Sequence, residues 1–335
     1  MSYRRFAGLA EPPMTPLRPP YYYADNVHYV KLPVGRVPRP VPDNLEAVTS
    51  RSVGRVLFVS DLDGTLLRPD ATLGARTVRA VNTFVSNGGL FTYATARSFT
   101  SAAPITAPLD LRLPVITYGG AVVVDPVTRR PRQARLLPAR SVERILSVAA
   151  VVQFVEPILF VVHEGRDRVC WLADRCTPWM DGFLAKRRGD PRLFPLREWA
   201  QVDMSSIFDV TLISARAPLV ELRDALVDVA SECHVVFSEE IYVPDEWWLT
   251  FTSPEATKAA AVRSVQTEVA AERLVCCGDN QNDLPMFAVA DVALAVANAL
   301  PEIREVATEI IGGNESEGVA GWLERHGAGL LAASD

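Results

Sequence analysis

Short apolar runs and longer amphipathic segments alternate along the chain from Val53 onward. Apolar runs bounded by turn residues predict strands, and apolar positions at helical spacing predict helices. On this basis the main strands are expected at residues 55–61, 90–96, 272–280 and 292–298, with a third strand that enters a hairpin within 114–125, and helices at 72–89 and 98–107. Strands that alternate with helices form parallel sheets covered on both faces. The pattern therefore predicts an α/β fold with a doubly wound parallel sheet.

Residues 138–252 interrupt this alternation with a different pattern of apolar and polar positions. Its patterns predict helices at 141–152 and 218–232 and strands at 158–164, 168–174 and 209–215. It contains no run of residues suited to catalysis, so we interpret it as an inserted, smaller α/β domain. The division of the chain that follows is an N-terminal extension at 1–52, a core in two parts at 53–137 and 253–335, and the insertion at 138–252.

The N-terminal extension is dense in proline, which removes backbone donors and fixes φ. We therefore expect residues 1 to about 50 to be extended and irregular. The extension is either a leader or strap on the domain surface, with the three tyrosines at 21–23 docking part of it, or an interaction arm.

Composition limits the partners of the protein. The 34 basic and 40 acidic residues give a net charge of −6 without a basic run, which argues against nucleic acid. No apolar run reaches the roughly 18 to 20 residues of a membrane-spanning helix. Five cysteines without a CxxC pair, in a chain with no signal-peptide pattern, predict buried, reduced thiols and a cytoplasmic protein. No pattern indicates an oligomeric state.

Polar residues gather where the predicted core strands end, which in open α/β sheets is the edge where ligands bind. These residues are Asp61, Asp63, Thr95, Arg97, Lys258, Asp279, Asn282 and Asp283. Mg²⁺ prefers carboxylates, water and substrate phosphate as ligands. Asp61 and Asp279 could supply such a site with the carbonyl of Asp63, and Asp283 could hold the ion directly or through water.

Lys258 and Thr95 have a different task at the same edge. A phosphoryl group that approaches a cluster of acids must have its negative charge neutralised, and an ammonium and a hydroxyl beside a metal do this. The sequence therefore predicts a site for a small phosphorylated molecule.

Four motifs resemble those of the haloacid dehalogenase (HAD) superfamily. DLDGTLL at 61–67 resembles the first motif, DxDGT, and YATAR at 93–97 resembles the second. Lys258 in SPEATKAAAV is similar to the third, and GDNQNDLPMF at 278–287 to the fourth, GDxxND. Their order and spacing resemble the Cof-type branch, in which an α/β cap of the C2 type lies between the second and third motifs. The resemblance spans about residues 54–322 and implies a Rossmann-like core.

The resemblance implies a magnesium-dependent phosphatase acting on a small phosphorylated metabolite such as a sugar phosphate or nucleotide. Asp61 would attack phosphorus and form an aspartyl-phosphate, and Asp63 would protonate the leaving alcohol and later accept a proton from water. Expected contacts to phosphate or substrate are Thr95, Arg97, Lys258 and Asn282, and expected contributors to the metal site are Asp61, Asp63, Asp279 and Asp283. A phosphomutase on a sugar phosphate and a non-catalytic phospho-ligand-binding protein remain as alternatives.

Several positions depart from the pattern that the resemblance implies. Residues 95–97 read Thr-Ala-Arg in place of TGR, Ala259 follows the lysine in place of glycine, and residues 297–299 read ANA in place of GNA. Gly119 stands where the family usually has the asparagine of NGA, which puts the usual substrate contacts in question but leaves the core chemistry.

Two features allow two interpretations each. Arg97 could contact substrate or form a surface ion pair. Trp247 and Trp248 could stack on a sugar or base, or form a hydrophobic hinge that seats the cap.

Overall fold

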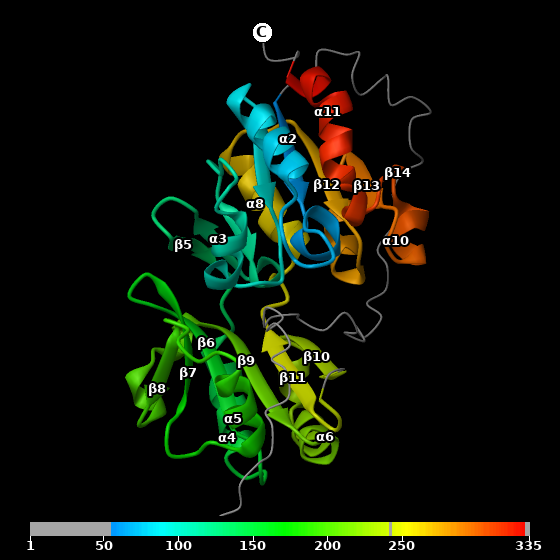
Figure 1. Cartoon of the computed structure of the whole chain (residues 1–335). Coiled ribbons are helices and arrows are strands. Elements are labelled where there is room, and N and C mark those ends of the chain that lie inside the picture. Colours follow the sequence, from blue (N-terminus) through cyan, green and yellow to red (C-terminus); the bar gives the residue numbers. More distant parts are fainter. Residues whose placement is uncertain (1–54, 241–242, 332–335) are drawn as a thin grey trace, which may run out of the picture.

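The computed structural model describes residues 55–240 and 243–331 (Figure 1), so the predicted extension at 1–52 lies outside the described residues. The strands are β1 (Val56–Ser60), β2 (Leu90–Tyr93), β3 (Val115–Thr117), β4 (Val122–Asp125), β5 (Arg130–Ala134), β6 (Pro157–His163), β7 (Arg166–Leu172), β8 (Leu193–Leu196), β9 (Ile207–Ser214), β10 (His234–Glu239), β11 (Trp247–Thr252), β12 (Arg273–Gly278), β13 (Val292–Val296) and β14 (Glu309–Ile311). The α-helices are α2 (Ala75–Ser86), α3 (Phe99–Thr106), α4 (Ala139–Ala149), α5 (Pro178–Ala185), α6 (Arg216–Ala225), α7 (Val227–Ala230), α8 (Lys258–Glu268), α9 (Leu284–Phe287), α10 (Pro301–Val306) and α11 (Gly318–Leu331).

Five parallel strands form the central sheet, in the order β14-β13-β12-β1-β2. β1 is buried along its whole length, as expected of an apolar strand in the middle of a parallel sheet. Its Phe58 ring packs against Phe84 of α2 and Trp322 of α11, with ring centroids 6.4 and 5.6 Å away. α2 and α11 cover this face together, and α8 lies behind the sheet (Figure 1). The predicted doubly wound parallel core is confirmed.

A smaller antiparallel sheet, β3-β4-β5, extends the core beyond β2. A single parallel bridge between Ala94 and Ile116 joins the two sheets. This bridge places the turn after β3 next to the end of β2, where the second motif lies.

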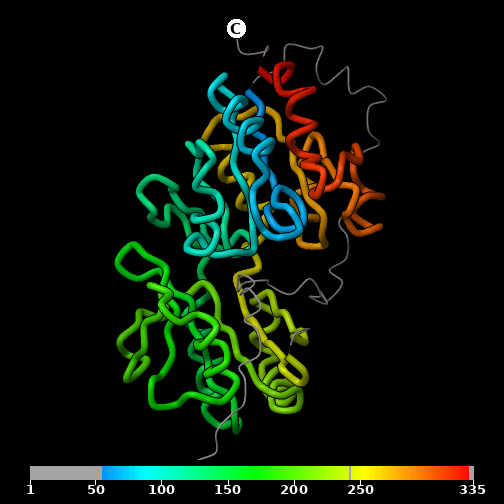
Figure 2. Tube along the Cα trace, in the orientation of Figure 1, coloured from blue at the N-terminus to red at the C-terminus, as the bar shows by residue number. Residues whose placement is uncertain are grey.

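Residues 157–252 form a separate six-stranded sheet, in the order β10-β11-β9-β6-β7-β8. Neighbouring strands are antiparallel except β7 and β8. One face packs against α4, α6 and α7, and the other carries Phe160 and Phe208. Figure 2 shows this sheet and its helices as a second body, which the chain enters after β5 and leaves after β11. We refer to residues 138–252 as the insertion.

The predicted helix at 218–232 is wrong in one respect, because it is two helices. α6 and α7 are separated at Leu226, whose φ of −113° and ψ of 27° lie outside the helical region. α5 and β8 were not predicted, because Pro178 and Pro195 fall inside their short sequences. Proline is nevertheless tolerated in the first turn of a helix and on an edge strand.

Trp247 and Trp248 point to opposite faces of their sheet, since side chains alternate along a strand. The Trp247 ring packs against Phe237 with a centroid distance of 4.9 Å, and the Trp248 ring packs against Phe183 of α5 at 5.7 Å. Trp248 Nε1 also donates to Glu246 Oε1 at 2.9 Å. Both indoles therefore have packing partners within the insertion. Stacking on a sugar or base and a hinge that seats the cap both stay predictions.

Two expectations from composition can be compared with the structure. All five cysteines are free thiols, and four are buried as expected, but Cys176 is exposed. Within residues 55–240 and 243–331, every helix is either too short or too polar to cross a membrane.

Candidate active site

Asp61 and Asp279 meet at one edge of the core sheet because β1 and β12 are parallel neighbours. The Asp61 amide donates to the Cys277 carbonyl at 3.0 Å, which continues the ladder one residue beyond β1. The turn Leu62–Leu66 follows and carries Gly64 at a φ of +77°. A Cβ on Gly64 would lie 2.3 Å from Asp279 Oδ2. Only glycine therefore allows the turn to pass so close to this carboxylate.

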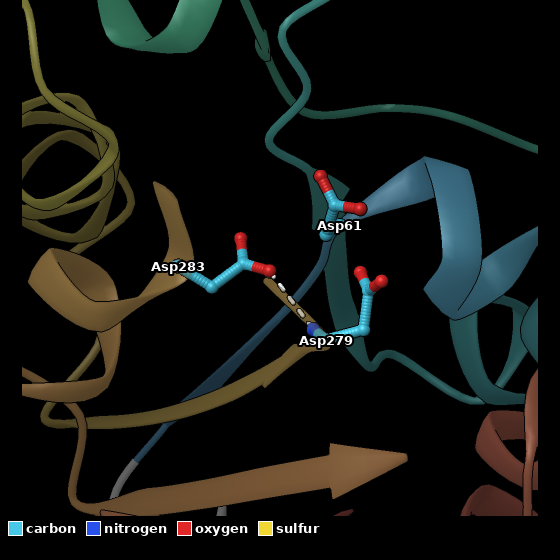
Figure 3. Close-up of side chains that lie close together, drawn as sticks. All are labelled: Asp61, Asp279 and Asp283. Atoms are coloured by element: carbon cyan, nitrogen blue, oxygen red, sulfur yellow. Dashed lines mark hydrogen bonds between the residues drawn. The ribbon is translucent and has the colours of Figure 1, made fainter. Parts of the chain in front are cut away.

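Asp61, Asp279 and Asp283 form an acidic cluster, in which one carboxylate oxygen from each lies within 4.8 Å of the others (Figure 3). Thr65 Oγ1 donates to Asp279 Oδ1 at 2.8 Å and orients this carboxylate. Carboxylate oxygens in such a group are the hard donors that Mg²⁺ prefers. By its donor type, the acidic cluster fits a hard divalent cation.

Lys258 places an ammonium against two members of the acidic cluster. It begins α8, and its Nζ donates to Asp61 Oδ1 and, at 2.6 Å, to Asp283 Oδ1. Lys258 is only 1% exposed. Burial alone would lower its pKa, but Asp283 and Asp61 raise it by more, so the pKa of Lys258 is raised and the ammonium stays charged.

Burial has the opposite effect on the nucleophile candidate. It raises the pKa of the Asp61 carboxyl well above its usual range; Lys258 opposes this rise, while Asp283 and Asp279 add to it. Three carboxylates against one ammonium leave two surplus negative charges when all are ionised. Unbalanced buried charge is costly, so the charge of the acidic cluster, like its donor type, matches a divalent cation.

Asp283 uses both carboxylate oxygens inside the protein. Oδ1 accepts from Lys258, and Oδ2 accepts from the amides of Asp279 and Asn280 at 2.9 and 3.1 Å. Its side chain is fully buried. Asp283 therefore fixes the lysine and the loop after β12. This arrangement suits the indirect contact to a metal that the sequence left open.

Asn282 lies beside Asp283 and leaves one polar atom unused. Its Oδ1 is buried and has no hydrogen-bond partner among the described residues. Such an atom in a native site calls for a specific partner. The observation is compatible with the predicted contact to a ligand.

Asp63 is held apart from the acidic cluster. Arg97 Nε donates to Asp63 Oδ2 at 2.7 Å and Arg97 Nη2 to Oδ1 at 2.5 Å, a bidentate pair. The Arg97 side chain is 7% exposed and that of Asp63 is 32% exposed. The predicted ion pair of Arg97 is present but is buried in the site, and its partner is the proposed proton carrier.

Thr95 is buried, and its side chain is hydrogen-bonded to the backbone of Arg97. The Arg97 amide donates to Thr95 Oγ1 at 3.1 Å, which leaves the hydroxyl proton available for another acceptor. The Gly119 amide donates to the Thr95 carbonyl at 3.0 Å. A Cβ on Gly119 would meet no described atom within 4 Å, so the position of the usual asparagine borders open space.

Sequence reasoning missed two residues that shape the site. Thr65, in the first motif, orients Asp279, and Asn298 Nδ2 donates to the Gly64 carbonyl at 2.8 Å. Asn298 Oδ1 in turn accepts from the Asn314 amide at 2.9 Å. The signal for Asn298 was its place in the ANA turn at 297–299, which follows β13 at the same edge of the sheet.

The model of the haloacid dehalogenase-like hydrolases matches residues 58–323. The chain belongs to this family. The motifs from which the resemblance was inferred lie within the matched residues, at the edge of the sheet described above. A haloacid dehalogenase-like hydrolase from Bacteroides thetaiotaomicron has the same fold, with a TM-score of 0.66 and 17% identity over 81% of this chain and 99% of that one.

Curated relatives of this haloacid dehalogenase-like hydrolase are phosphatases of small molecules. The 5-amino-6-(5-phospho-D-ribitylamino)uracil phosphatase YitU of Bacillus subtilis (strain 168) is 23% identical over 281 residues, which cover 81% of this chain and 97% of the relative. The HMP-PP phosphatase of Yersinia pseudotuberculosis (strain IP 31758) is 27% identical over 272 residues, which cover 80% and 93%. The predicted enzyme class, a phosphoric monoester hydrolase, is confirmed.

Proposed function

We propose that the chain is a cytoplasmic, magnesium-dependent phosphatase that hydrolyses a phosphate monoester of a small metabolite, such as a sugar phosphate or nucleotide, through an aspartyl-phosphate. The observation that carries this proposal is the separation of two acids. Asp61 lies in the acidic cluster beside Lys258, whereas Asp63, two residues on, is held outside it by Arg97. A nucleophile and a proton carrier need such different surroundings.

In the first step, an Asp61 oxygen attacks phosphorus, the bond from phosphorus to the ester oxygen breaks, and protonated Asp63 gives its proton to the departing alkoxide. In the second step, Asp63 takes a proton from water, whose oxygen attacks phosphorus and releases inorganic phosphate and Asp61. Lys258 and the Thr95 hydroxyl stabilise charge on the phosphoryl oxygens in both steps.

Asp61, Asp279 and the Asp63 carbonyl would hold Mg²⁺, with Asp283 helping directly or through water. When bound, the ion supplies positive charge for the phosphoryl oxygens and balances the surplus negative charge of the acidic cluster.

The insertion would act as a cap over the substrate. A cap excludes water from the reaction and adds contacts that select among small substrates. A cap of 115 residues, from 138 to 252, leaves little access for a protein side chain, so we infer a small phosphorylated metabolite as the partner and neither nucleic acid nor membrane.

The test is a phosphate-release screen over sugar phosphates, nucleotides and cofactor phosphates with Mg²⁺. We expect release by the wild-type protein, its loss on chelation, and its loss in Asp61→Asn, while Asp174→Asn, at an exposed acid outside the site, behaves as wild type. Rapid acid quenching should also leave a phosphorylated peptide that contains Asp61. Undiminished turnover by Asp61→Asn would refute the mechanism.

A further inference from the structure

Tyr118 belongs to the core by sequence but places its side chain in the insertion. It follows β3 directly and has a φ of +51°, and Gly119 and Gly120 follow at +64° and +107°. A left-handed φ is energetically unfavourable for a residue with a side chain. Tyr118 therefore needs other contacts to hold it there, and such an outlier is a reason to look for function.

The insertion binds both ends of the Tyr118 side chain. The ring centroid lies 4.9 Å from that of Phe208 and 6.0 Å from that of Phe160. The hydroxyl donates to Asp167 Oδ2 at 2.6 Å and accepts from Arg192 Nη1 at 2.5 Å. Burial raises the pKa of Tyr118 although Arg192 lowers it, so the phenol keeps the proton that it donates to Asp167.

Arg192 is the centre of a buried set of four interacting side chains, which we call the polar group; the other members are Tyr118, Asp167 and Asp190. Its side chain is 6% exposed, and its Nη2 donates to Asp190 Oδ2 at 2.5 Å, while Nη1 lies 3.7 Å from Asp167 Oδ2. Charged groups that are buried and mutually bonded have few alternative arrangements, because breaking one bond leaves a buried charge unpaired. The polar group therefore offers the Tyr118 hydroxyl one well-defined position.

The backbone of the same turn supports the proton carrier. The Tyr118 amide donates to the Arg97 carbonyl at 3.0 Å, and the Gly119 amide donates to the Thr95 carbonyl at 3.0 Å. Arg97 then holds Asp63 with its bidentate pair. A continuous chain of contacts thus runs from the insertion through Tyr118 and Arg97 to Asp63.

The turn Tyr118–Gly120 also packs against the backbone of Thr257 and Lys258. A Cβ on Gly120 would lie 2.2 Å from the Thr257 carbonyl oxygen and 2.8 Å from the Lys258 nitrogen. The Gly120 carbonyl accepts from Arg135 Nη1 at 3.0 Å, and Arg135 lies on the segment that leads into the insertion. The turn cannot shift without moving against these neighbours.

We propose that Tyr118 is a positioning residue that makes the placement of Asp63 depend on the seating of the insertion against the core. The insertion binds the Tyr118 side chain, so the position of Tyr118 depends on the position of the insertion. The Tyr118 backbone fixes Arg97, and Arg97 orients the Asp63 carboxylate toward the leaving group. The inference rests on the proposed phosphatase function for the role of Asp63, whereas the link between insertion and turn stands on the contacts alone.

The test compares Tyr118→Phe with Tyr93→Phe, which removes the hydroxyl of a fully buried tyrosine in β2 outside this polar group. Amide hydrogen exchange of a peptide covering residues 115–121 reports the turn without any substrate. We expect exchange there to rise about tenfold in Tyr118→Phe and to stay at the wild-type rate in Tyr93→Phe. Asp167→Asn should raise it in the same direction. Unchanged exchange in Tyr118→Phe would overturn the link between hydroxyl and turn.

Single-turnover release of the alcohol then tests the role of Asp63. A phosphate ester of an alkyl alcohol needs a proton on its leaving group, whereas p-nitrophenyl phosphate hardly does. Tyr118→Phe should slow alkyl release about tenfold or more and p-nitrophenol release much less. Equal slowing of both would overturn the role of Tyr118 in positioning Asp63. Absence of turnover by the wild-type protein would refute the proposed function, while the exchange comparison would still decide the link.

Discussion

Arg97 and Asp63 form a bidentate ion pair beside the acidic cluster and outside it, with donor–acceptor distances of 2.7 and 2.5 Å. The pair gives the two acids of the first motif different neighbours, because Asp61 faces the Lys258 ammonium. A guanidinium fixes both oxygens of a carboxylate in one plane, which an ammonium cannot do. The orientation of the Asp63 carboxylate thus depends on the planar shape of the Arg97 guanidinium as well as on its positive charge.

Arg97→Lys should keep the charge but release Asp63 from its fixed plane. We expect kcat for an alkyl phosphate to fall roughly ten- to a hundredfold, which is part of the roughly 10²- to 10⁴-fold that a proton carrier contributes, with a smaller loss for p-nitrophenyl phosphate. Arg112→Lys is the control, because Arg112 Nη2 donates to Asp110 Oδ2 at 2.5 Å in an exposed ion pair outside the site. Steady-state kinetics on both esters would contradict the prediction if the two variants behaved alike.

Mg²⁺ should stabilise the folded protein through the acidic cluster. A ligand at a hundred times its Kd adds about 2.7 kcal/mol to the free energy of unfolding. We expect thermal unfolding to shift upward with Mg²⁺ in the wild-type protein and to shift much less in Asp279→Asn. Asp174→Asn should retain the wild-type shift. An equal shift in Asp279→Asn would show that the ion binds elsewhere.

The sequence alone predicted that Asp61, Asp279 and Thr95 meet at one edge of the core sheet, because topology dictates it. Asp61 and Asp279 end parallel neighbouring strands, so their proximity follows once β1 and β12 are recognised. The same reasoning brings Thr95 to this edge through β2. The bounds of β1 were predictable for a similar reason, since this buried strand is a continuous apolar run. The segment 114–125 is instead divided into β3 and β4 by the turn Tyr118–Gly120.

The sequence did not predict which side chains pair with one another within the site. Nothing in the spacing of DLDGT says that Asp63 faces Arg97, 34 positions away, or that Asp283 gives both oxygens to Lys258 and the loop amides. The contact of Tyr118 with Asp167 and Arg192 likewise joins segments 49 and 74 positions apart. The contacts of Asp63 and Asp283 depend on the conformation of the loops after the core strands, and those of Tyr118 on how the insertion packs against the core. Motif and periodicity specify neither.

A buried acid in the insertion should make stability depend on pH. Asp209 of β9 is 6% exposed, and burial raises the pKa of its carboxyl from 3.8 to about 7, against a lowering by the Thr211 hydroxyl, which donates at 2.7 Å. Between these two values the folded state holds a proton that the unfolded state has released. The contribution of Asp209 to the free energy of unfolding is therefore fully present below about pH 4 and is lost progressively as the pH rises to about 7.

Asp209→Asn should remove this dependence, since an amide oxygen can still accept from Thr211. We expect the variant to be more stable than the wild-type protein at pH 8, by up to roughly 4 kcal/mol, and to differ little at pH 4. Urea unfolding at both pH values measures the difference. A difference that does not change with pH would contradict the prediction.

Gly64 and Gly88 form a natural pair for testing how closely the catalytic turn must approach Asp279. Both have a left-handed φ, +77° and +93°, so alanine should destabilise either site by about 1 kcal/mol. At Gly64 the new Cβ would also lie 2.3 Å from Asp279 Oδ2, whereas at Gly88 it would meet no described atom within 4 Å. Gly64→Ala should therefore lose phosphate release and the Mg²⁺-dependent thermal shift together, because the carboxylate must move away. Gly88→Ala should keep both, and full activity in a folded Gly64→Ala protein would show that the close approach is not required.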